Sequence, residues 1–343
     1  MGNYATTAKI QAAIQKGTFN PHAYLTNMSM AYYQSADAYV AKSMFPIVPV
    51  QLSTGHYYTF SAEDLARDNV QRKPEFGKVN PAIVGYAEET YSCKVDQIIR
   101  GIDEVAQVNI SRSPVPASVD PKRSISKFFA EQMNIHQDVL FAQSYFKQGV
   151  WSNEWTGTDA YKTENKEFIK FNDANFDPFE FFDELMTDME EKGRRRPNRL
   201  GLGVQAWNAL KRCPAILDRI SGGATAGNPA VVTQQLVAQM LDIEKIVVFR
   251  STYNSAAFGQ KENMQFICDP GAALLCYATD APAIDEPSAG YMFTWDPLGD
   301  GNYFPTLQWP GEGGTHSEFM EGLMATDMKK TSDVLGVFLH GCV

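Results

Sequence analysis

The stretch that decides the fold lies near the end of the chain and reads PSAGYMFTW (residues 287–295), HSEFMEGLMATDMKKTSD (residues 316–333) and GVFLHGC (residues 336–342). Segments of this kind, separated by turns that we expect at residues 297–301 and 310–314, are typical of β-strands. None of the three contains a nucleophile motif, a cluster of metal ligands or a phosphate-binding loop. The final third of the chain is therefore predicted to be β-rich, and nothing in it points to catalysis.

Two helices are predicted upstream of these strands. The longer covers residues 121–148, with Asp120 as N-cap and Pro121 at the first helical position. Its apolar residues recur at helical spacing: Ile125, Phe128, Phe129, Met133, Val139, Leu140 and Phe146. At ~1.5 Å per residue it would be about 40 Å long, which suggests a spine. The shorter opens at Asp177, with Pro178 and Glu180 completing a capping signal, and ends at Gly193.

The remaining elements form a mixed block. Residues 150–176 are predicted as a loop region, and strands are predicted at residues 200–204, 246–249, 265–269 and 273–277. Short helices are expected at residues 207–212 and 232–240. A long helix followed by a mixed block and C-terminal strands is an α+β pattern.

The beginning of the chain, residues 1–54, is predicted to be an arm. Its end, FPIVPV (residues 45–50), is extended because each proline lacks an amide donor and restricts the residue before it. If the arm were free, Phe45, Ile47 and Val48 would be exposed, so they need a partner surface on the chain's own core or on a neighbour. Deleting residues 1–50 is expected to leave the core folded but to impair assembly.

Residues 55–101 are predicted to form a long β-hairpin. The strands HYYTF (residues 56–60) and TYSCKV (residues 90–95) flank a tip of mixed charge, which is too polar to pack into a core. A connection of that length is usually either functional or disordered. The candidate contact residues at the tip are Glu63, Asp64, Asp68, Arg72 and Lys73.

Composition limits the classes of function. The chain has 343 residues, of which 44% are hydrophobic, so a sizeable core is possible, and its formal net charge of −10 argues against a broad basic face for nucleic acid. The five cysteines contain no CxxC pair, so neither a zinc site nor a disulfide framework is expected. No apolar signal segment and no run of ~20 apolar residues occurs, so we expect neither secretion nor a membrane-bound form.

Candidate catalytic motifs are weak. Gly201 and Gly203 form a lone GxG, which fits small residues in a packed strand better than a phosphate site. The turn from Asp296 to Asn302 lacks the spacing of a calcium loop. The five histidines are scattered, and His136 is expected to be a core histidine on the spine helix. No catalytic residue, metal, cofactor or small-molecule substrate is predicted.

The run Arg194, Arg195 and Arg196 follows the end of a predicted helix, where cations are favoured by the helix dipole. A contact with a neighbouring subunit and a contact with nucleic acid remain the alternatives. An acidic partner on a neighbouring copy could be Glu63, Asp64 and Asp68.

Several segments, taken in order, resemble the major capsid proteins of tailed phages, which share the Hong Kong 97-type shell fold. The resemblance runs over most of the chain from about residue 20 and rests on order rather than on one motif. The matching segments are TGHYYTF to YSCKVD (54–96), FKQGVW (146–151), FDPFEFFDELM (176–186), GRRRPNRLGLGVQAWNALKRCPAILDRI (193–220), EKIVVFRSTYNSAAFG (244–259) and the C-terminal strands quoted first.

The resemblance implies a division into regions. These are an N-terminal arm (1–54), an extended β-hairpin loop (55–101), a peripheral domain (102–176) on the spine helix (121–148), a mixed α/β axial domain (177–314), and C-terminal strands (315–343) that return to both domains. It also implies hexamers and pentamers that form an icosahedral head around double-stranded DNA, first as a procapsid and then expanded. Expected partners are copies of the chain, a separate scaffolding protein, a portal, decoration proteins and DNA contacted non-specifically. The expected location is the virion, after assembly in the host cytoplasm.

Two other functions stay open at this point. A nanocompartment shell with the same fold, of the encapsulin kind, would enclose an enzyme instead of a genome. An unrelated soluble enzyme has only the acidic turn and the scattered histidines in its support.

Overall fold

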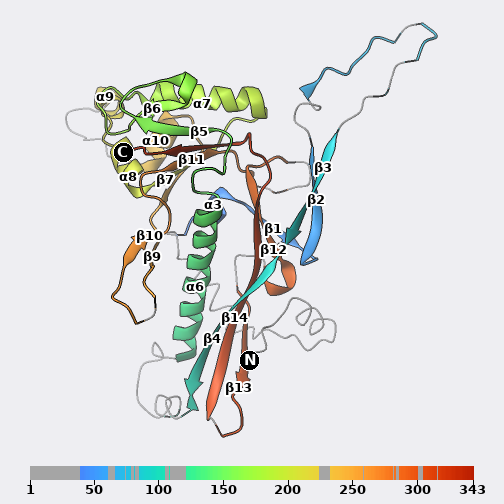
Figure 1. Cartoon of the computed structure of the whole chain (residues 1–343), viewed down its shortest axis with the longest axis vertical. Coiled ribbons are helices and arrows are strands. Elements are labelled where there is room, and N and C mark those ends of the chain that lie inside the picture. Colours follow the sequence, from blue (N-terminus) through green and yellow to red (C-terminus); the bar gives the residue numbers. More distant parts are fainter. Residues whose placement is uncertain are drawn as a thin grey trace.

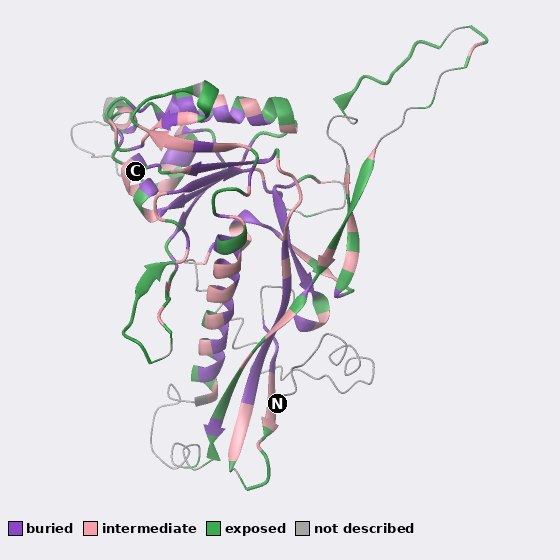
Figure 2. Ribbon diagram, in the orientation of Figure 1, coloured by how far each residue is buried: buried purple, intermediate pink, exposed green. Residues whose placement is uncertain are grey.

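The computed structural model describes residues 39–60, 66–73, 75–78, 81, 85–104, 108, 121–223, 232–257, 259–280, 282, 286–299, 304–314 and 316–343. Two β-sheets and one long helix make up its framework (Figure 1). Most buried residues lie on these sheets and on the helix faces that cover them, whereas two hairpins project with exposed surfaces (Figure 2).

The first sheet is built on its longest strand, β14 (Ser317–Lys330). One edge of β14 pairs with β4 (Lys94–Asp103) over ten residues. The other edge pairs with β13 (Thr306–Pro310) and then with β12 (Gly290–Trp295), which in turn pairs with β1 (Ile47–Val50) in parallel. The C-terminal segments thus form strands, as their sequence predicts.

The spine helix α6 (Pro121–Ser144) lies along this sheet (Figure 1). Phe129 packs with Met320 of β14, and Met133 with Met324. Gly322 allows a close approach, because a Cβ there would lie 3.2 Å from the ring of Phe129. The predicted helix is confirmed, although it ends at Ser144 rather than at residue 148 and is followed by turns. Its predicted N-cap, Asp120, lies outside the described residues.

The buried face of α6 differs from the predicted one. Asn134, Gln137 and Asp138 are buried, whereas Val139 and Leu140 are only half-buried. His136 was expected in the core, but its side chain is 44% exposed and pairs with Asp96 of β4 at 3.4 Å. From Ile125 onward, the buried positions of α6 are three or four residues apart and form one stripe along the helix. His136 lies next to this stripe and not on it, so its side chain faces outward.

The second sheet has six strands. Their order is β6 (Glu167–Ile169), β5 (Glu154–Thr158), β15 (Gly336–His340), β11 (Ala273–Cys276), β7 (Arg199–Gly203) and β8 (Lys245–Phe249). Helices α7 (Pro178–Gly193), α8 (Val204–Leu210), α9 (Pro214–Gly223) and α10 (Gln234–Met240) complete this part of the molecule (Figure 1).

The prediction of a loop over residues 150–176 is wrong. This segment supplies β5, β6 and a 3₁₀ turn (Thr163–Asn165). Both strands are short, and each contributes a single buried large side chain, Trp155 and Phe168, so they lack the alternating pattern that predicts a strand.

The capping signal of α7 is confirmed at its start. The Asp177 carboxylate accepts a hydrogen bond from the amide of Phe179 at 2.9 Å, and Pro178 occupies the first position. The helix ends at Gly193 as predicted, but the residue in the left-handed conformation is Arg194. Gly193 serves close packing instead, because a Cβ there would lie 2.7 Å from Leu335.

Smaller elements complete the chain: α3 (Ala41–Met44), β2 (Thr54–Phe60), β3 (Tyr86–Ser92), β9 (Thr252–Asn254), β10 (Met264–Phe266) and the 3₁₀ turn η3 (Asp296–Leu298). The β2–β3 pair forms a hairpin that projects from the body of the molecule (Figure 1), as predicted, but it ends at Ser92, and residues 94–101 of the predicted loop belong to β4 in the first sheet. Residues 102–176, 177–314 and 315–343 each contribute to both halves of the framework, so the boundary predicted between residues 176 and 177 does not separate the two sheets.

Replacing Phe129 by Ala tests the packing of the spine helix. Phe129 is fully buried against β14, so the cavity left behind should lower the free energy of unfolding by about 3–5 kcal/mol. Chemical denaturation measures this. Phe76→Ala is the matched control, because the Phe76 side chain is 99% exposed, and it should leave the midpoint nearly unchanged. Equal midpoints for the two variants would contradict the packing.

Candidate assembly surfaces

The end of the predicted arm is packed into the chain's own core. Phe45 is fully buried, and its ring lies 5.3 Å from that of Phe141 and 4.9 Å from that of Tyr145. Ile47 and Val48 are half-buried in β1, opposite residues of β12. Phe45 is therefore a core residue and unavailable to a neighbour, because the groove between α6 and β12 already accommodates it. Deleting residues 1–50 would remove part of this core, so the truncated chain is now expected to lose stability as well as assembly.

Asp138 of α6 holds the arm in this position. Its carboxylate accepts hydrogen bonds from the amide of Ala41 at 3.0 Å and from the hydroxyl of Ser251, after β8, at 2.7 Å. One turn earlier, Asn134 accepts from the ammonium of Lys42 at 3.3 Å. Burial raises the pKa of Asp138 to about 6, although these hydrogen bonds act in the opposite direction. One carboxylate thus joins the arm, the spine helix and the end of β8.

The base of the β2–β3 hairpin is anchored on the first sheet. Tyr91 stacks on Phe293 of β12 at 4.7 Å, and Tyr57 lies 5.4 Å from the same ring. The amide of Ser92 donates to the carboxylate of Asp327 in β14 at 2.8 Å. Gly55 permits the stacking, because a Cβ there would lie 2.5 Å from the Tyr91 hydroxyl oxygen. The hairpin therefore leaves the body at a fixed place.

Beyond this base the hairpin is exposed (Figure 2). Asp68, Arg72 and Lys73 are exposed, as the polar sequence of the tip suggests, and Glu63 and Asp64 lie outside the described residues. Val70 is 89% exposed and Phe76 99% exposed. Large apolar side chains in such positions suit a surface that another molecule covers.

The three arginines after α7 separate from one another. Arg194 ends the helix, and its amide donates to the carbonyl of Glu190 at 2.9 Å. Arg195 pairs with Glu286 at 3.3 Å, and Arg196 pairs with Asp242 at 2.8 Å beside an open pocket of about 500 Å³. Arg195 and Arg196 thus have acidic partners within the chain, and a contact of this run with Glu63, Asp64 or Asp68 of another copy stays a prediction.

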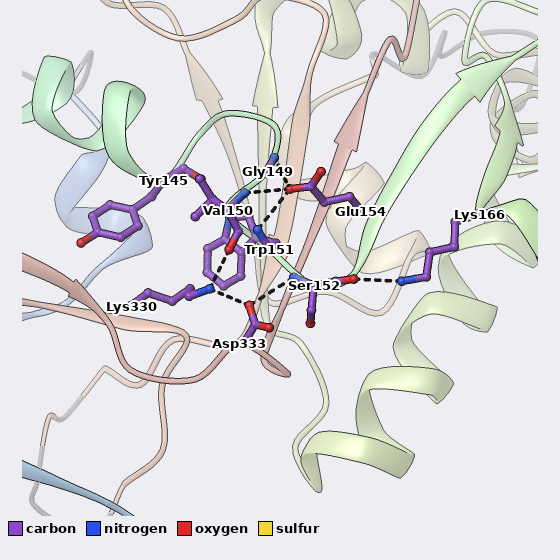
Figure 3. A network of polar contacts seen from close by, with 9 residues as sticks. All are labelled: Tyr145, Gly149, Val150, Trp151, Ser152, Glu154, Lys166, Lys330 and Asp333. Carbon is purple, nitrogen blue, oxygen red and sulfur yellow. Dashed lines mark hydrogen bonds and ion pairs between the residues drawn. The ribbon is translucent and has the colours of Figure 1, made fainter. Parts of the chain in front are cut away.

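A polar network fixes the junction between the spine helix and the second sheet (Figure 3). One carboxylate oxygen of Glu154 accepts from the amides of Gly149, Val150 and Trp151 at 2.7, 3.0 and 3.1 Å. The ammonium of Lys330, at the end of β14, donates to the carbonyl of Val150 at 2.6 Å. This network ties the turn after α6 to both sheets.

Asp333 extends the network. It accepts from Lys330 at 2.7 Å and from the amide of Ser152 at 3.2 Å, and the carbonyl of Ser152 accepts from Lys166 at 3.0 Å (Figure 3). Burial alone would raise the pKa of Asp333, but the hydrogen bonds from Lys330 and Ser152 outweigh it and lower the pKa. This junction is not predictable from the sequence, because it joins the turn after α6 to Lys330 and Asp333, which lie far away in the chain.

The described residues offer little for catalysis. They contain no group of three or more His, Cys, Asp or Glu side chains placed to hold a metal ion. All five cysteines are buried, and burial raises the pKa of the Cys276 thiol to about 12. His56 and His316 each pair with a single surface carboxylate. Within the same residues, no helix combines the length and the apolar character needed to cross a bilayer.

The GxG in β7 serves packing, as predicted. A Cβ at Gly201 would lie 2.7 Å from the ring of Phe249, and one at Gly203 would lie 2.4 Å from the carbonyl oxygen of Pro270. Asp296 begins the 3₁₀ turn η3, and Asp300 and Asn302 lie outside the described residues, so the interpretation of this segment as an ordinary acidic turn stays a prediction.

Comparison with known proteins gives matches in sequence and in structure. The chain is 22% identical over 235 residues to the major capsid protein of Burkholderia phage BcepMu, which covers 67% of this chain and 68% of that protein. Its fold matches a phage-related protein from Bordetella bronchiseptica RB50 with a TM-score of 0.69, 17% identity, and coverage of 94% of this chain and 97% of that one. No protein-family model matches the chain.

A further solved structure shares the fold. The virus-like particle from Pyrococcus furiosus matches with a TM-score of 0.51 and 8% identity, over 92% of this chain and 98% of that one. The structure therefore belongs to the class of Hong Kong 97-type shell folds, which confirms the predicted fold class. The family that the sequence match and the fold support is that of phage major capsid proteins, which confirms the resemblance seen in the sequence.

Replacing Glu154 by Ala tests the junction at the end of the spine helix. Three amides would lose their acceptor, so the free energy of unfolding should fall by about 1–3 kcal/mol. Chemical denaturation measures the loss. Glu154→Gln retains an acceptor oxygen and should lose less, and equal losses in the two variants would count against the role of that oxygen.

The pKa of Asp138 predicts a pH dependence. Because the folded-state pKa is raised from 3.8 to about 6, the folded state binds this proton more tightly than the unfolded state does. The contribution to stability is complete below pH 3.8 and is lost as the pH rises through about 6. Thermal midpoints measured between pH 5 and 8 should therefore fall more steeply in the parent protein than in Asp138→Asn. Parallel curves would contradict a raised pKa.

Proposed function

We propose that the chain is the major capsid protein of a tailed phage, and that copies of it form hexamers and pentamers that close into an icosahedral head. The observation that carries the proposal is the match of fold over 94% of the chain, combined with sequence similarity to a protein described as a major capsid protein.

The shape of the subunit supports assembly. An isolated two-stranded hairpin is marginally stable in water, yet β2–β3 projects with exposed Tyr58 and Tyr86, whose rings meet edge to face at 5.6 Å. Coverage by a neighbouring copy would bury these residues. Obligate assemblies typically bury ~2,000 Å² or more at an interface, and repeated heterologous contacts close into rings.

The finer steps follow from the same proposal. The head would first form as a procapsid with a separate scaffolding protein, then expand as double-stranded DNA enters through a portal, with decoration proteins as further partners. The net charge of −10 suits an inner wall that surrounds DNA without binding it tightly. The protein would be assembled in the host cytoplasm, reside in the virion and act structurally rather than as an enzyme.

A nanocompartment shell is the second candidate, because the fold also occurs in a virus-like particle from Pyrococcus furiosus, so the fold by itself does not specify a phage head. The sequence match to a phage protein favours the phage head. The contents of purified particles distinguish the two, since a phage head encloses DNA and a nanocompartment encloses a cargo protein.

Sedimentation velocity and negative-stain electron microscopy of the purified chain test the proposal. We expect ring-shaped capsomers or closed shells that sediment far faster than a 38.2 kDa monomer. Persistence of a monomer or small oligomer over a range of salt and crowding conditions would contradict it.

A further inference from the structure

The inner face of the spine helix is apolar toward both of its ends and polar in between. Near the start of α6, Phe129 packs in an apolar cluster with β14, and near its end Phe141 belongs to a large hydrophobic cluster. Between these two rings the helix turns Asn134, Gln137 and Asp138 toward the interior, and each is at most 2% exposed. Buried polar side chains need hydrogen-bond partners, because an unpaired polar group is costly to bury.

Two of these three side chains have such partners, and the third does not. The carboxylate of Asp138 and the amide oxygen of Asn134 each accept a hydrogen bond from the arm. The amide nitrogen of Gln137 donates to the sulfur of Met324 in β14 at 3.1 Å, which is a weak acceptor. Its Oε1 atom has no hydrogen-bond partner in the described part of the chain. The Gln137 amide therefore meets the sheet with one polar atom unsatisfied.

The strand surface that Gln137 contacts carries two more polar atoms of this kind. Thr294 of β12 and Thr326 of β14 are 1% and 6% exposed, and neither hydroxyl has a hydrogen-bond partner among the described residues. The two threonines are direct partners in the β12–β14 register, so they share one face, with Cβ atoms roughly 5 Å apart. Thr326 lies two residues from Met324, so this is the face that the Gln137 amide contacts.

The three unsatisfied atoms therefore gather at one place. Across the residues that the structure describes, they are the only fully buried side-chain oxygen or nitrogen atoms without a hydrogen-bond partner. None of them is charged. Water suits such a set, because it donates to an amide oxygen and can both donate to and accept from a hydroxyl. Buried water typically makes about three hydrogen bonds, to polar groups that lack a partner in the protein.

We propose that ordered water is bound between α6 and the β12–β14 pair, where it bridges Oε1 of Gln137 to the hydroxyls of Thr294 and Thr326. The site lies within one subunit, so it goes beyond the proposed function and does not depend on it. The bound water supplies the partners that the protein itself does not, and it joins the helix to two strands at once.

A structure of the purified protein at a resolution that shows ordered water tests the site directly. We expect density within hydrogen-bond distance of Oε1 of Gln137 and of at least one of the two threonine hydroxyls. The same density should be lost from a variant that combines Thr294→Val with Thr326→Val. Absence of the density from the parent protein, or three groups that bond to one another or to other protein atoms instead, would overturn the proposal.

The stability of Thr326→Val is an independent test, because valine has nearly the shape of threonine without the hydroxyl. If the hydroxyl binds water, its loss should lower the thermal midpoint by roughly 1–4 °C, the shift expected from a lost hydrogen bond in a chain of this length. If the hydroxyl were buried without any partner, its removal would raise the midpoint.

Thr331→Val is the matched control, because the hydroxyl of Thr331 donates to the carbonyl of Ser288 at 2.8 Å. Its midpoint should fall in the same range. A midpoint of Thr326→Val that stays unchanged or rises, while that of Thr331→Val falls, would also overturn the water site.

Discussion

The packing of the spine helix α6 on the long strand β14 is the contact on which the rest of the structure depends. Phe129 and Met133 meet Met320 and Met324 along this line, and β14 pairs along its edges with β4, β12 and β13. Because α6 ends beside the second sheet and β14 leads into it through β15, the same pair also joins the two halves of the molecule. A subunit of a shell must resist mechanical force, and one continuous packed contact between α6 and β14 helps it to do so.

Polar contacts fix the packed pair of α6 and β14 to the segments around it. Asp138 holds the arm and the end of β8 to the C-terminal part of the helix, and Glu154 with Lys330 holds the turn that follows the helix. Buried polar contacts of this kind depend on geometry, because an unpaired group is costly, so they favour one arrangement of the two sheets over others. The hairpin, anchored through Phe293 and Asp327, is then held at a defined direction from the body.

Much of this framework is predictable from the sequence. The α6 pattern, the Asp177–Pro178 start of α7 and the strand-rich C-terminus are local signals, and local physics suffices for them. Strands β5 and β6 are not predictable, because both are short and the strand that holds β5 in the sheet, β15, lies far away in the chain, while β6 pairs only with β5. Phe45 illustrates the same limit. The sequence predicts that this apolar side chain needs a surface to pack against, but only the fold shows that α6 provides that surface.

The candidate assembly surfaces, too, are predictable from the sequence only in part. Exposure of Asp68, Arg72 and Lys73 follows from their polar surroundings, whereas the pairing of Arg195 with Glu286 and of Arg196 with Asp242 is visible only in the fold. A cryo-electron microscopy reconstruction of the assembled protein tests the central claim most directly. The account predicts a closed icosahedral shell in which the β2–β3 hairpin of each copy lies over a neighbour. A discrete particle without such symmetry, or a shell in which the hairpins contact no other copy, would contradict it.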